Sequence, residues 1–233
     1  MQQLVIRLCL SIVALSAVVA HALAKDSAKW APQPLAGMMI EFMHTDGTLA
    51  KHRITKVEGN NVWNTVDFDN GGVPAKNVNI TYRSIITWQI YRPAEGVIRW
   101  EFDRKKLDTL WPLQVGKSVR VKTKLMLGRG KTLEAAAAKL KQTHSITYRF
   151  VVEGRRHVTV KGGTWQAWVI SRVAEQRDMK GTLTYVGMRR YWLAERLGWI
   201  VRLDTDDIRP DEKKNRITTM QATAVALPAR KKN

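Results

Sequence analysis

The stretch that decides the fold reads YRFVVEGRRHVTVKGGTWQAWVIS from Tyr148 to Ser171 and YVGMRRYWLAERLGWIVRL from Tyr185 to Leu203. It consists of short runs rich in β-branched and aromatic residues, separated by glycines and charged pairs. Such runs are typical of consecutive antiparallel strands. The stretch holds four of the nine tryptophans of the chain, and arginines accompany most of them. We therefore expect an antiparallel sheet here, around which the rest of the protein is organised.

Further strands are expected on the N-terminal side of this stretch. Turn signals at Asp46-Gly47 and at 69–72 separate apolar runs between residues 35 and 91, which predicts a hairpin-rich meander. Within residues 115–127, Val119, Val121 and Thr123 alternate with Arg120, Lys122 and Lys124. This alternation predicts a strand with one β-branched face and one cationic face.

A different spacing follows the cationic strand. Leu133, Ala136, Ala137 and Leu140 recur at helical intervals, and Thr132 is a suitable N-cap residue. The sequence thus predicts an all-β, mostly antiparallel protein, a curved sheet or partly open barrel with one short helix, preceded by a small β meander. The expected organisation is a signal peptide (1–24), an N-terminal β meander (25–92), a main sheet or open-barrel domain (93–227) and a basic tail (228–233).

The first 24 residues have the pattern of a secretory signal peptide. Arg7 gives a short positive start, residues 8–20 are apolar, and Ala22-Leu23-Ala24 is an A-x-A cleavage site. The apolar run is shorter than the roughly 20 residues of a membrane-spanning helix. We expect cleavage after Ala24 and a periplasmic or secreted product with no transmembrane span, although an uncleaved anchor stays open. Cleavage would also remove Cys9, the only cysteine, and with it any disulfide.

Composition bears on the partners of the protein rather than on its fold. The hydrophobic content of 45% suffices for a packed core. The formal net charge is +19, from 39 Lys and Arg against 20 Asp and Glu, and it predicts attraction to anionic partners. An exported protein meets lipid head groups and acidic glycans rather than nucleic acid. We therefore expect an anionic envelope component (a lipid, a glycan or an acidic protein surface) as partner, no nucleic acid and no cofactor.

Sequence motifs for a particular catalytic chemistry are incomplete. Residues 128–132 end in the Gly-Lys-Thr of a phosphate-binding loop, but Leu125 stands where that pattern requires glycine. The chain contains no G-x-S-x-G nucleophile motif and no pair of histidines at H-x-x-x-H spacing. A hydrolase that uses a carboxylate pair, such as Glu95 with Glu101 or Asp103, remains an alternative without a distinguishing pattern.

The acidic segment 204–212 is interpreted as part of a loop that extends to Lys214. It lacks the calcium-binding pattern of an EF-hand because Ile208 occupies a position where that pattern needs an oxygen ligand. An irregular metal site near Asp204 to Glu212 stays open, and no metal ligand is predicted.

The pattern that recurs is the interleaving of aromatic and cationic side chains. Tryptophan and tyrosine suit a half-buried face, while arginine can fork onto carboxylate or phosphate and stack on rings. The competing interpretation, tryptophans in the core and arginines in solvent, stays open. The predicted ligand-binding residues are Arg120, Lys122, Lys124, Arg155, Arg156, Trp165, Trp168, Arg189, Arg190 and Trp192.

The segment VTVKGGTWQAWVI at 158–170, followed by RYW at 190–192 and LGWIVR at 197–202, resembles a class of uncharacterised bacterial periplasmic and envelope proteins. That class carries V-x-V-x-x-G-T-[WF], then R-Y-W and G-x-[IV]-V-R, and often an upstream W-P-L-x-x-G-K, here at 111–117. The resemblance spans 111–203, with Lys161-Gly162 in place of the usual Pro-Ala and an apparent insertion at 129–142. It implies a partly closed barrel of long antiparallel strands and supplies no catalytic residues.

Taken together, these features predict an exported, non-enzymatic binding or envelope-associated β protein with a strongly cationic surface. Its partner would be an anionic lipid, glycan or acidic protein. A periplasmic hydrolase of an envelope polymer, acting through carboxylates that the sequence does not identify, is the alternative.

Overall fold

The computed structural model describes residues 33–69, 74–92, 96–130, 132–208 and 216–229. The expected signal peptide, its cleavage site after Ala24, the end of the basic tail from residue 230 on, Asp211 and Glu212 lie outside these ranges. Among the described residues, no helix combines the length and apolar character needed to cross a membrane.

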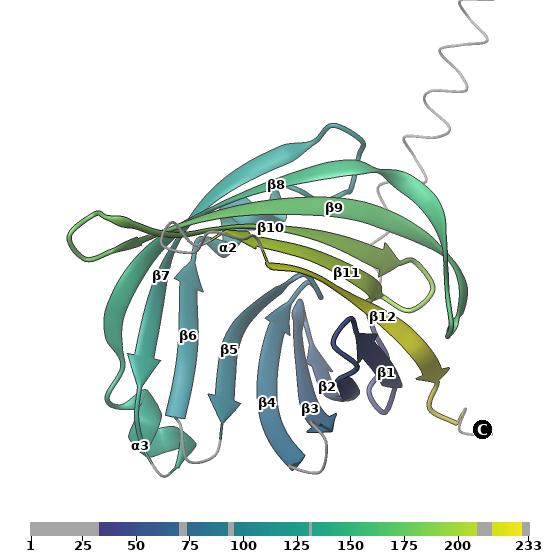
Figure 1. Cartoon of the computed structure of the whole chain (residues 1–233), viewed down its shortest axis with the longest axis horizontal. Helices are drawn as coiled ribbons and strands as arrows, with labels where there is room; N and C mark the ends of the chain where they lie inside the picture. Colours follow the sequence, from purple (N-terminus) through teal and green to yellow (C-terminus); the bar gives the residue numbers. More distant parts are fainter. Residues whose placement is uncertain (1–32, 70–73, 93–95, 131, 209–215, 230–233) are drawn as a thin grey trace, which may run out of the picture.

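The described chain forms a closed antiparallel barrel in which each strand pairs with its neighbours in sequence (Figure 1). The first strand also pairs with the last, from Met39 opposite Ala226 to His44 opposite Met220. The prediction of an all-β antiparallel protein is confirmed, and the barrel is fully closed rather than partly open. The strands are β1 (Met39–His44), β2 (Leu49–Glu58), β3 (Asn61–Asp69), β4 (Pro74–Tyr82), β5 (Ile86–Arg92), β6 (Gly96–Phe102), β7 (Ser118–Gly128), β8 (Lys141–Val160), β9 (Gly163–Asp178), β10 (Leu183–Ala194), β11 (Trp199–Ile208) and β12 (Arg216–Ala226).

The meander expected at the N-terminus consists of β1 to β5, and these strands belong to the same closed barrel as β6 to β12. The stretch from Tyr148 to Leu203 supplies most of β8, all of β9 and β10 and half of β11, and the first two of these are the longest strands. In Figure 1 these long strands cross above the shorter strands β2 to β6. The two groups of strands enclose the interior of the barrel.

Strand β7 has the two faces that its sequence predicts. Val119, Val121 and Thr123 are buried, whereas Arg120, Lys122 and Lys124 are exposed. The period-2 geometry of a strand sends alternate side chains to opposite sides of the sheet. In this closed barrel, the cationic face of β7 is therefore on the outside.

Two short helices lie between strands. The predicted helix is confirmed as α3 (Leu133–Ala137), and the side chain of Thr132 caps it by accepting a hydrogen bond from the N–H of Ala135. It ends three residues earlier than the expected Leu140. No helix was predicted for α2 (Arg104–Asp108), which Asp103 caps and which buries Leu107 in the core.

The core consists of two clusters of buried side chains. One contains Phe42, Ile54 and Trp199 and also receives the far end of the β8–β9 hairpin, where the N–H of Gly162 donates to the carbonyl of Ala222 at 2.9 Å. The other contains Leu107, Phe150 and Ile170. Burial of these side chains removes apolar surface from water. It stabilises the folded protein by roughly 25 cal/mol per Å² of apolar surface buried and is the main stabilising contribution.

The loop expected from Asp204 onward is wrong in its first part, because β11 continues to Ile208. Aspartate is disfavoured in strands, but partners on β11 itself and on β10 accommodate these side chains. The carboxylate of Asp204 accepts hydrogen bonds from Arg202 at 2.8 Å and from Trp192 Nε1 at 3.3 Å. Asp207 accepts one from the hydroxyl of Tyr185.

Candidate functional site

The interior of the barrel contains a cavity of about 790 Å³. This volume lies within the range of roughly 300–1,000 Å³ that is typical of small-molecule sites. Side chains from both groups of strands line it: His44, His52, Asn64, Val66, Phe68, Asn79, Thr81, Ser84, Ile85, Thr87, Ile90, Arg92, Ile98, Trp100, Leu125, Ile146, Tyr148, Arg172, Ala174, Gln176, Thr184, Tyr185, Arg189, Tyr191, Trp199, Ile200, Leu203, Asp207 and Met220.

Two arginines lie side by side on one wall of this cavity. Arg172 on β9 and Arg189 on β10 are direct register partners, and both line the cavity. Arg172 is only 7% exposed. The Nε atoms of both guanidinium groups are buried without a hydrogen-bond partner among the described residues. Like charges directly opposite each other on neighbouring strands are destabilising, and more so away from water. This pair is therefore a feature that packing alone does not explain.

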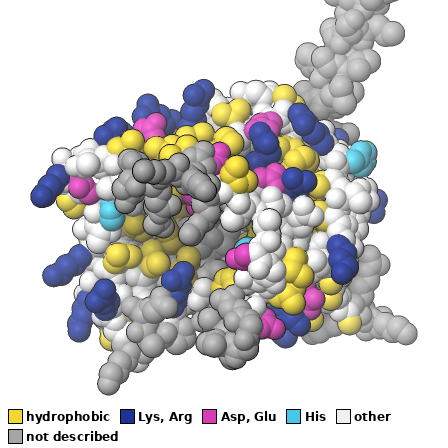
Figure 2. Space-filling view, in the orientation of Figure 1, with side chains coloured by type: hydrophobic (Ala, Val, Ile, Leu, Met, Phe, Trp, Pro, Cys, Tyr) yellow, Lys and Arg dark blue, Asp and Glu magenta, His cyan; other side chains and the backbone are white. Residues whose placement is uncertain are grey.

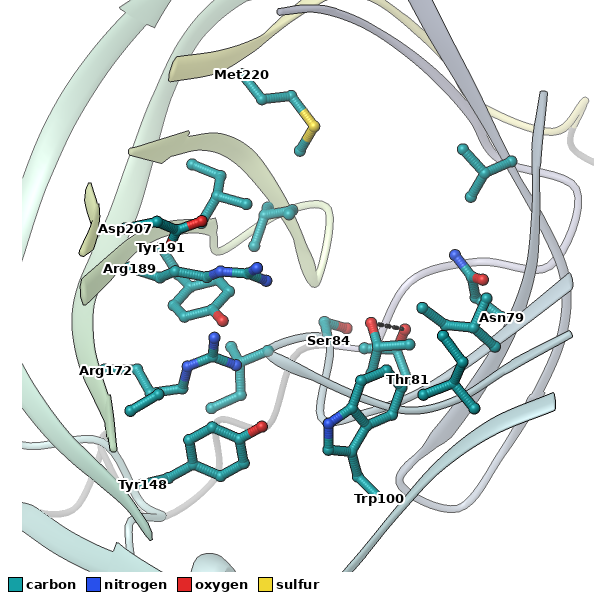
Figure 3. Close-up of a pocket in the computed structure, with 18 of the residues that line it drawn as sticks. Asn79, Thr81, Ser84, Trp100, Tyr148, Arg172, Arg189, Tyr191, Asp207 and Met220 are labelled. Atoms are coloured by element: carbon teal, nitrogen blue, oxygen red, sulfur yellow. Dashed lines mark hydrogen bonds between the residues drawn. The ribbon is translucent and has the colours of Figure 1, made fainter. Parts of the chain in front are cut away.

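Aromatic rings hold the first of these guanidinium groups. Arg172 lies between Tyr148 and Tyr191 (Figure 3), with its guanidinium carbon 4.6 Å and 5.7 Å from the two ring centroids. Such cation–π contacts stabilise by about 0.5–2 kcal/mol each. Burial raises the pKa of Tyr148, although the charge of Arg172 acts in the opposite direction. The tyrosine hydroxyl thus stays protonated and remains a hydrogen-bond donor inside the cavity.

The second arginine lies near the carboxylate of Asp207 on β11, as Figure 3 shows. Burial alone would lower the pKa of Arg189, but Tyr191, Tyr185 and Asp207 together raise it above its ordinary value. The guanidinium is therefore charged at any physiological pH. Asp207 in turn accepts a hydrogen bond from the Tyr185 hydroxyl, and this bond together with burial raises the pKa of Tyr185 to about 12.

The remaining titratable groups leave the cavity positive. Burial lowers the pKa of His52 to about 3, with a smaller contribution from His44. Burial also lowers the pKa of His44, opposed in part by Asp46. Both imidazoles are therefore neutral at pH 7. Among the described lining residues, the arginines then outnumber the one carboxylate, that of Asp207.

The facing wall, on β3 to β6, is partly polar, and its described lining residues include a third arginine, Arg92 on β5. Thr81 and Thr87 share a hydrogen bond of 3.4 Å, drawn as a dashed line in Figure 3, and Trp100 and Asn79 lie beside them. Asn64 and Asn79 are register partners, and the Oδ1 atoms of both are buried without a hydrogen-bond partner in the described part of the chain. Isoleucine, valine and leucine side chains fill the surface between these groups.

This arrangement can hold an anion and can enclose apolar or hydroxyl-bearing atoms attached to it. Guanidinium groups bind carboxylate and phosphate through charge-assisted hydrogen bonds. The described residues contain no group of three or more His, Cys, Asp or Glu side chains placed to share a metal ion. The carboxylates considered for a hydrolase are not together in the cavity: Glu101 is exposed, Asp103 caps α2, and Glu95 lies outside the described residues.

The structure does not bring the ten predicted ligand-binding residues together. Arg120, Lys122 and Lys124 are on the outer face of β7. Arg155 and Arg156 are exposed on β8, and Arg155 pairs with Glu195, with Nη2 to Oε2 at 2.6 Å.

The three predicted tryptophans are half-buried and pack at the margins of the core. Trp165 and Trp168 each contact one of the two core clusters. Trp192 lies under the guanidinium of Arg202, with 5.5 Å to the ring centroid, and its Nε1 bonds to Asp204.

The predicted dipeptide Arg189-Arg190 is divided between the two sides of the sheet. Arg189 lines the cavity, whereas Arg190 forms an ion pair of 3.0 Å with Glu153. Of the ten predicted residues, Arg189 is the only one that lines the cavity.

Sequence reasoning missed Arg172, Tyr148, Tyr191 and Asp207 as site residues. A signal for Arg172 was present, because Ile170 and Ala174 share its face of the strand and both are buried. A cation at an inward position between apolar residues marks an interior charge. Its nearness to Arg189 depends on strand register, which the sequence does not reveal.

No protein-family model matches this chain, and the comparison with curated proteins gives no significant match. Solved structures with a similar fold include a candidate exported protein with a YmcC-like fold from Bacteroides fragilis (TM-score 0.46, 11% identity, 83% of this chain and 97% of that chain). Others are the hypothetical lipoprotein YmcC from Escherichia coli (0.46, 9%, 91% and 96%) and a candidate lipoprotein from Parabacteroides distasonis (0.45, 9%, 84% and 98%). Because these TM-scores lie below 0.5, nothing about the function of this protein follows from them.

Proposed function

We propose that this protein is an exported, non-enzymatic binding protein that holds an anionic envelope component inside its barrel. The observation that carries the proposal is the register pair Arg172 and Arg189, two like charges that face the same cavity. Protein interiors rarely contain charges without partners, because each must be taken out of water. An anion placed between the two guanidinium groups would remove their repulsion and complete their hydrogen bonds.

Export is part of the proposal. Its support is the N-terminal pattern of Arg7, the apolar run 8–20 and Ala22-Leu23-Ala24. A mature protein cut after Ala24 would work in the periplasm or outside the cell, where lipid head groups and acidic glycans are abundant. The cavity volume excludes a folded acidic protein as its occupant, so the proposed ligand is a small molecule or the head group of a lipid.

The chemical group recognised at the arginine pair is a carboxylate or a phosphate. An acidic lipid and an acidic sugar both carry such a group, and they differ in what is attached to it. The cavity offers isoleucine and leucine side chains to a hydrocarbon chain, and Thr81, Asn64 and Asn79 to hydroxyl groups.

The test measures binding of defined probes to the purified mature protein by calorimetry. Dodecanoate and dodecyl phosphate represent acidic lipids, glucuronate represents acidic sugars, and dodecanol is the neutral control. We expect the anions of one class to bind, and dodecanol to bind at least about tenfold more weakly, because a charge-assisted hydrogen bond is worth about 1.5–3 kcal/mol. Native mass spectrometry of the protein purified from its own cell envelope would show the natural ligand.

Two variants and a matched control locate the binding. Arg172→Gln and Arg189→Gln each remove a guanidinium from the cavity, whereas Arg190→Gln removes the next guanidinium along the same strand, on the outer side. We expect the first two to weaken anion binding by about ten- to a hundredfold and the control to bind like the wild type. Equal binding by all three, or binding of dodecanol as tight as that of dodecanoate, would refute the proposal.

A further inference from the structure

A second unexplained pair of like charges lies on the outside of the barrel. Arg120 on β7 and Arg149 on β8 are direct register partners. Both are exposed, and neither takes part in an ion pair with a described residue. Directly opposed like charges on neighbouring strands destabilise a sheet unless a counter-charge lies over them. An anionic partner placed over the two arginines would supply such a counter-charge.

The series of register partners that begins with Arg120 and Arg149 continues across the sheet with apolar side chains. Arg149 is the register partner of Val173 on β9, and Val173 is the partner of Met188 on β10. Val173 is 36% and Met188 40% exposed, so both present large apolar side chains to solvent. We call Arg120, Arg149, Val173 and Met188 the outer row. It is basic at one end and apolar at the other.

The surroundings of the outer row are also basic. Lys122 and Lys124 follow Arg120 on the same face of β7, and Arg177 lies two positions beyond Glu175 on β9. The described acidic groups of this face are Glu101, opposite Lys124, Glu175, opposite Thr147, Glu153 on β8, which pairs with Arg190, and Asp206, the partner of Met188 at the far end. Figure 2 shows dark blue Lys and Arg side chains along the side of the molecule where β7 lies.

We propose that this outer face of β7 to β10 docks the protein onto the surface of an anionic phospholipid bilayer. A bilayer surface supplies closely spaced phosphates, which match the closely spaced guanidinium groups of Arg120 and Arg149. Immediately below the phosphates it supplies an apolar layer, which accepts exposed side chains such as Val173 and Met188. A soluble polyanion would neutralise the arginines but would leave these two apolar side chains in water.

The docking face is independent of the cavity. Arg172 and Arg189 line the interior, whereas their sequence neighbours Val173 and Met188 face the outer side of the same strands. The other two members of the outer row are exposed on β7 and β8. A failure of the membrane proposal would leave the proposed ligand site untouched, and the reverse also holds.

The test is co-sedimentation of the mature protein with vesicles of phosphatidylcholine mixed with phosphatidylglycerol, compared with vesicles of phosphatidylcholine alone. We expect binding to the anionic vesicles only. Raising the salt from about 0.1 M to about 1 M shortens the Debye length from about 10 Å to about 3 Å and should release most of the protein. Each basic residue near an anionic lipid surface contributes about fivefold in partitioning. The double variant Arg120→Glu with Arg149→Glu should therefore bind more than about 25-fold more weakly.

The matched control changes the same number of charges elsewhere. Arg156 and Lys161 are exposed near the tip of the β8–β9 hairpin, and Arg156→Glu with Lys161→Glu should retain most of the binding. Met188→Ser should weaken binding without a change in its salt dependence. Thermal unfolding checks that each variant is folded, and Arg120→Gln with Arg149→Gln is the milder replacement should the double reversal not fold. Equal loss in the control, or equal binding to phosphatidylcholine alone, would overturn the proposal.

Discussion

Gly187 on β10 and Asp207 on β11 are direct register partners, and the hydroxyl of Tyr185 reaches over Gly187 to donate a hydrogen bond to Asp207. A Cβ atom on residue 187 would lie 2.0 Å from the Tyr185 hydroxyl oxygen. The missing side chain thus makes the bond possible. The bond fixes Asp207, the one carboxylate among the described lining residues of the cavity, beside Arg189.

The first prediction concerns this glycine. Gly187→Ala should displace the ring of Tyr185, break its bond to Asp207 and lower the free energy of unfolding by about 1–3 kcal/mol, the cost of a buried polar group without its partner. Urea denaturation measures the change. Gly154→Ala on β8 is the control, because its Cβ would meet only Arg156 Nε at 3.7 Å. If the control lost as much free energy of unfolding as Gly187→Ala, the loss would come from replacing a strand glycine in general. It would then not come from displacing the ring of Tyr185.

The second prediction concerns alkaline pH. Burial and the bond to Asp207 raise the pKa of Tyr185 to about 12, above its ordinary value of 10.0. A group with a raised folded-state pKa contributes stability that is complete below pH 10 and is lost as the pH rises towards 12. Tyr185→Phe should therefore be less stable than the wild type at pH 8, and the difference should shrink above pH 10. Unfolding curves across this interval, together with the ultraviolet absorbance of tyrosinate, test it. A constant difference would contradict it.

The third prediction separates the two interior arginines in the ligand-free protein. Arg172→Met removes one of two like charges and loses two ring contacts of about 0.5–2 kcal/mol each, so these effects oppose each other. Arg189→Met removes the cation near Asp207 and leaves that carboxylate without its compensating charge. We expect Arg189→Met to be the more destabilising, by about 1–3 kcal/mol, in urea denaturation. The reverse order would show that the rings, rather than Asp207, dominate the energetics of the pair.

The fold could be predicted where buried and exposed side chains alternate along a single strand. Val119, Val121 and Thr123 against Arg120, Lys122 and Lys124 specified both faces of β7, and Thr132 correctly marked the start of α3. Closure of the barrel could not be predicted, because it depends on β1 and β12 meeting across almost the entire chain. Pairing at such sequence separation leaves no local pattern.

The candidate site was less predictable than the fold, for a related reason. Arg189 and Arg190 are both among the predicted ligand-binding residues, although adjacent residues in a strand face opposite sides. The dipeptide therefore divides between the cavity and the outer face. The sequence from Asp204 to Asp207 was predicted as a loop because aspartate is disfavoured in strands. The side chains that accommodate these aspartates, such as Tyr185 for Asp207, come close to them only through the register of the strands.

The last prediction concerns acid. His52 packs its ring edge-on against Phe42, with 4.8 Å between the ring centroids, and its Nδ1 is buried with no hydrogen-bond partner among the residues that the structure describes. Burial lowers the pKa of His52 from 6.5 to about 3. A histidine with a lowered folded-state pKa binds its proton more readily in the unfolded chain. Its contribution to stability is therefore complete above pH 6.5 and is lost as the pH falls towards 3.

We expect the wild type to lose on the order of 3 kcal/mol between about pH 6.5 and pH 4 through His52, since each unit of pH in this interval corresponds to about 1.4 kcal/mol. His52→Leu should reduce the loss, because leucine has no proton to bind and the pocket offers Nδ1 no partner. His157→Leu is the control, because it replaces an exposed histidine by the same residue. Urea denaturation at pH 7, 5.5 and 4 provides the comparison. If His52→Leu and the wild type lose stability in parallel, the acid sensitivity belongs to other groups, of which His44, also lowered in pKa by burial, is the next to test.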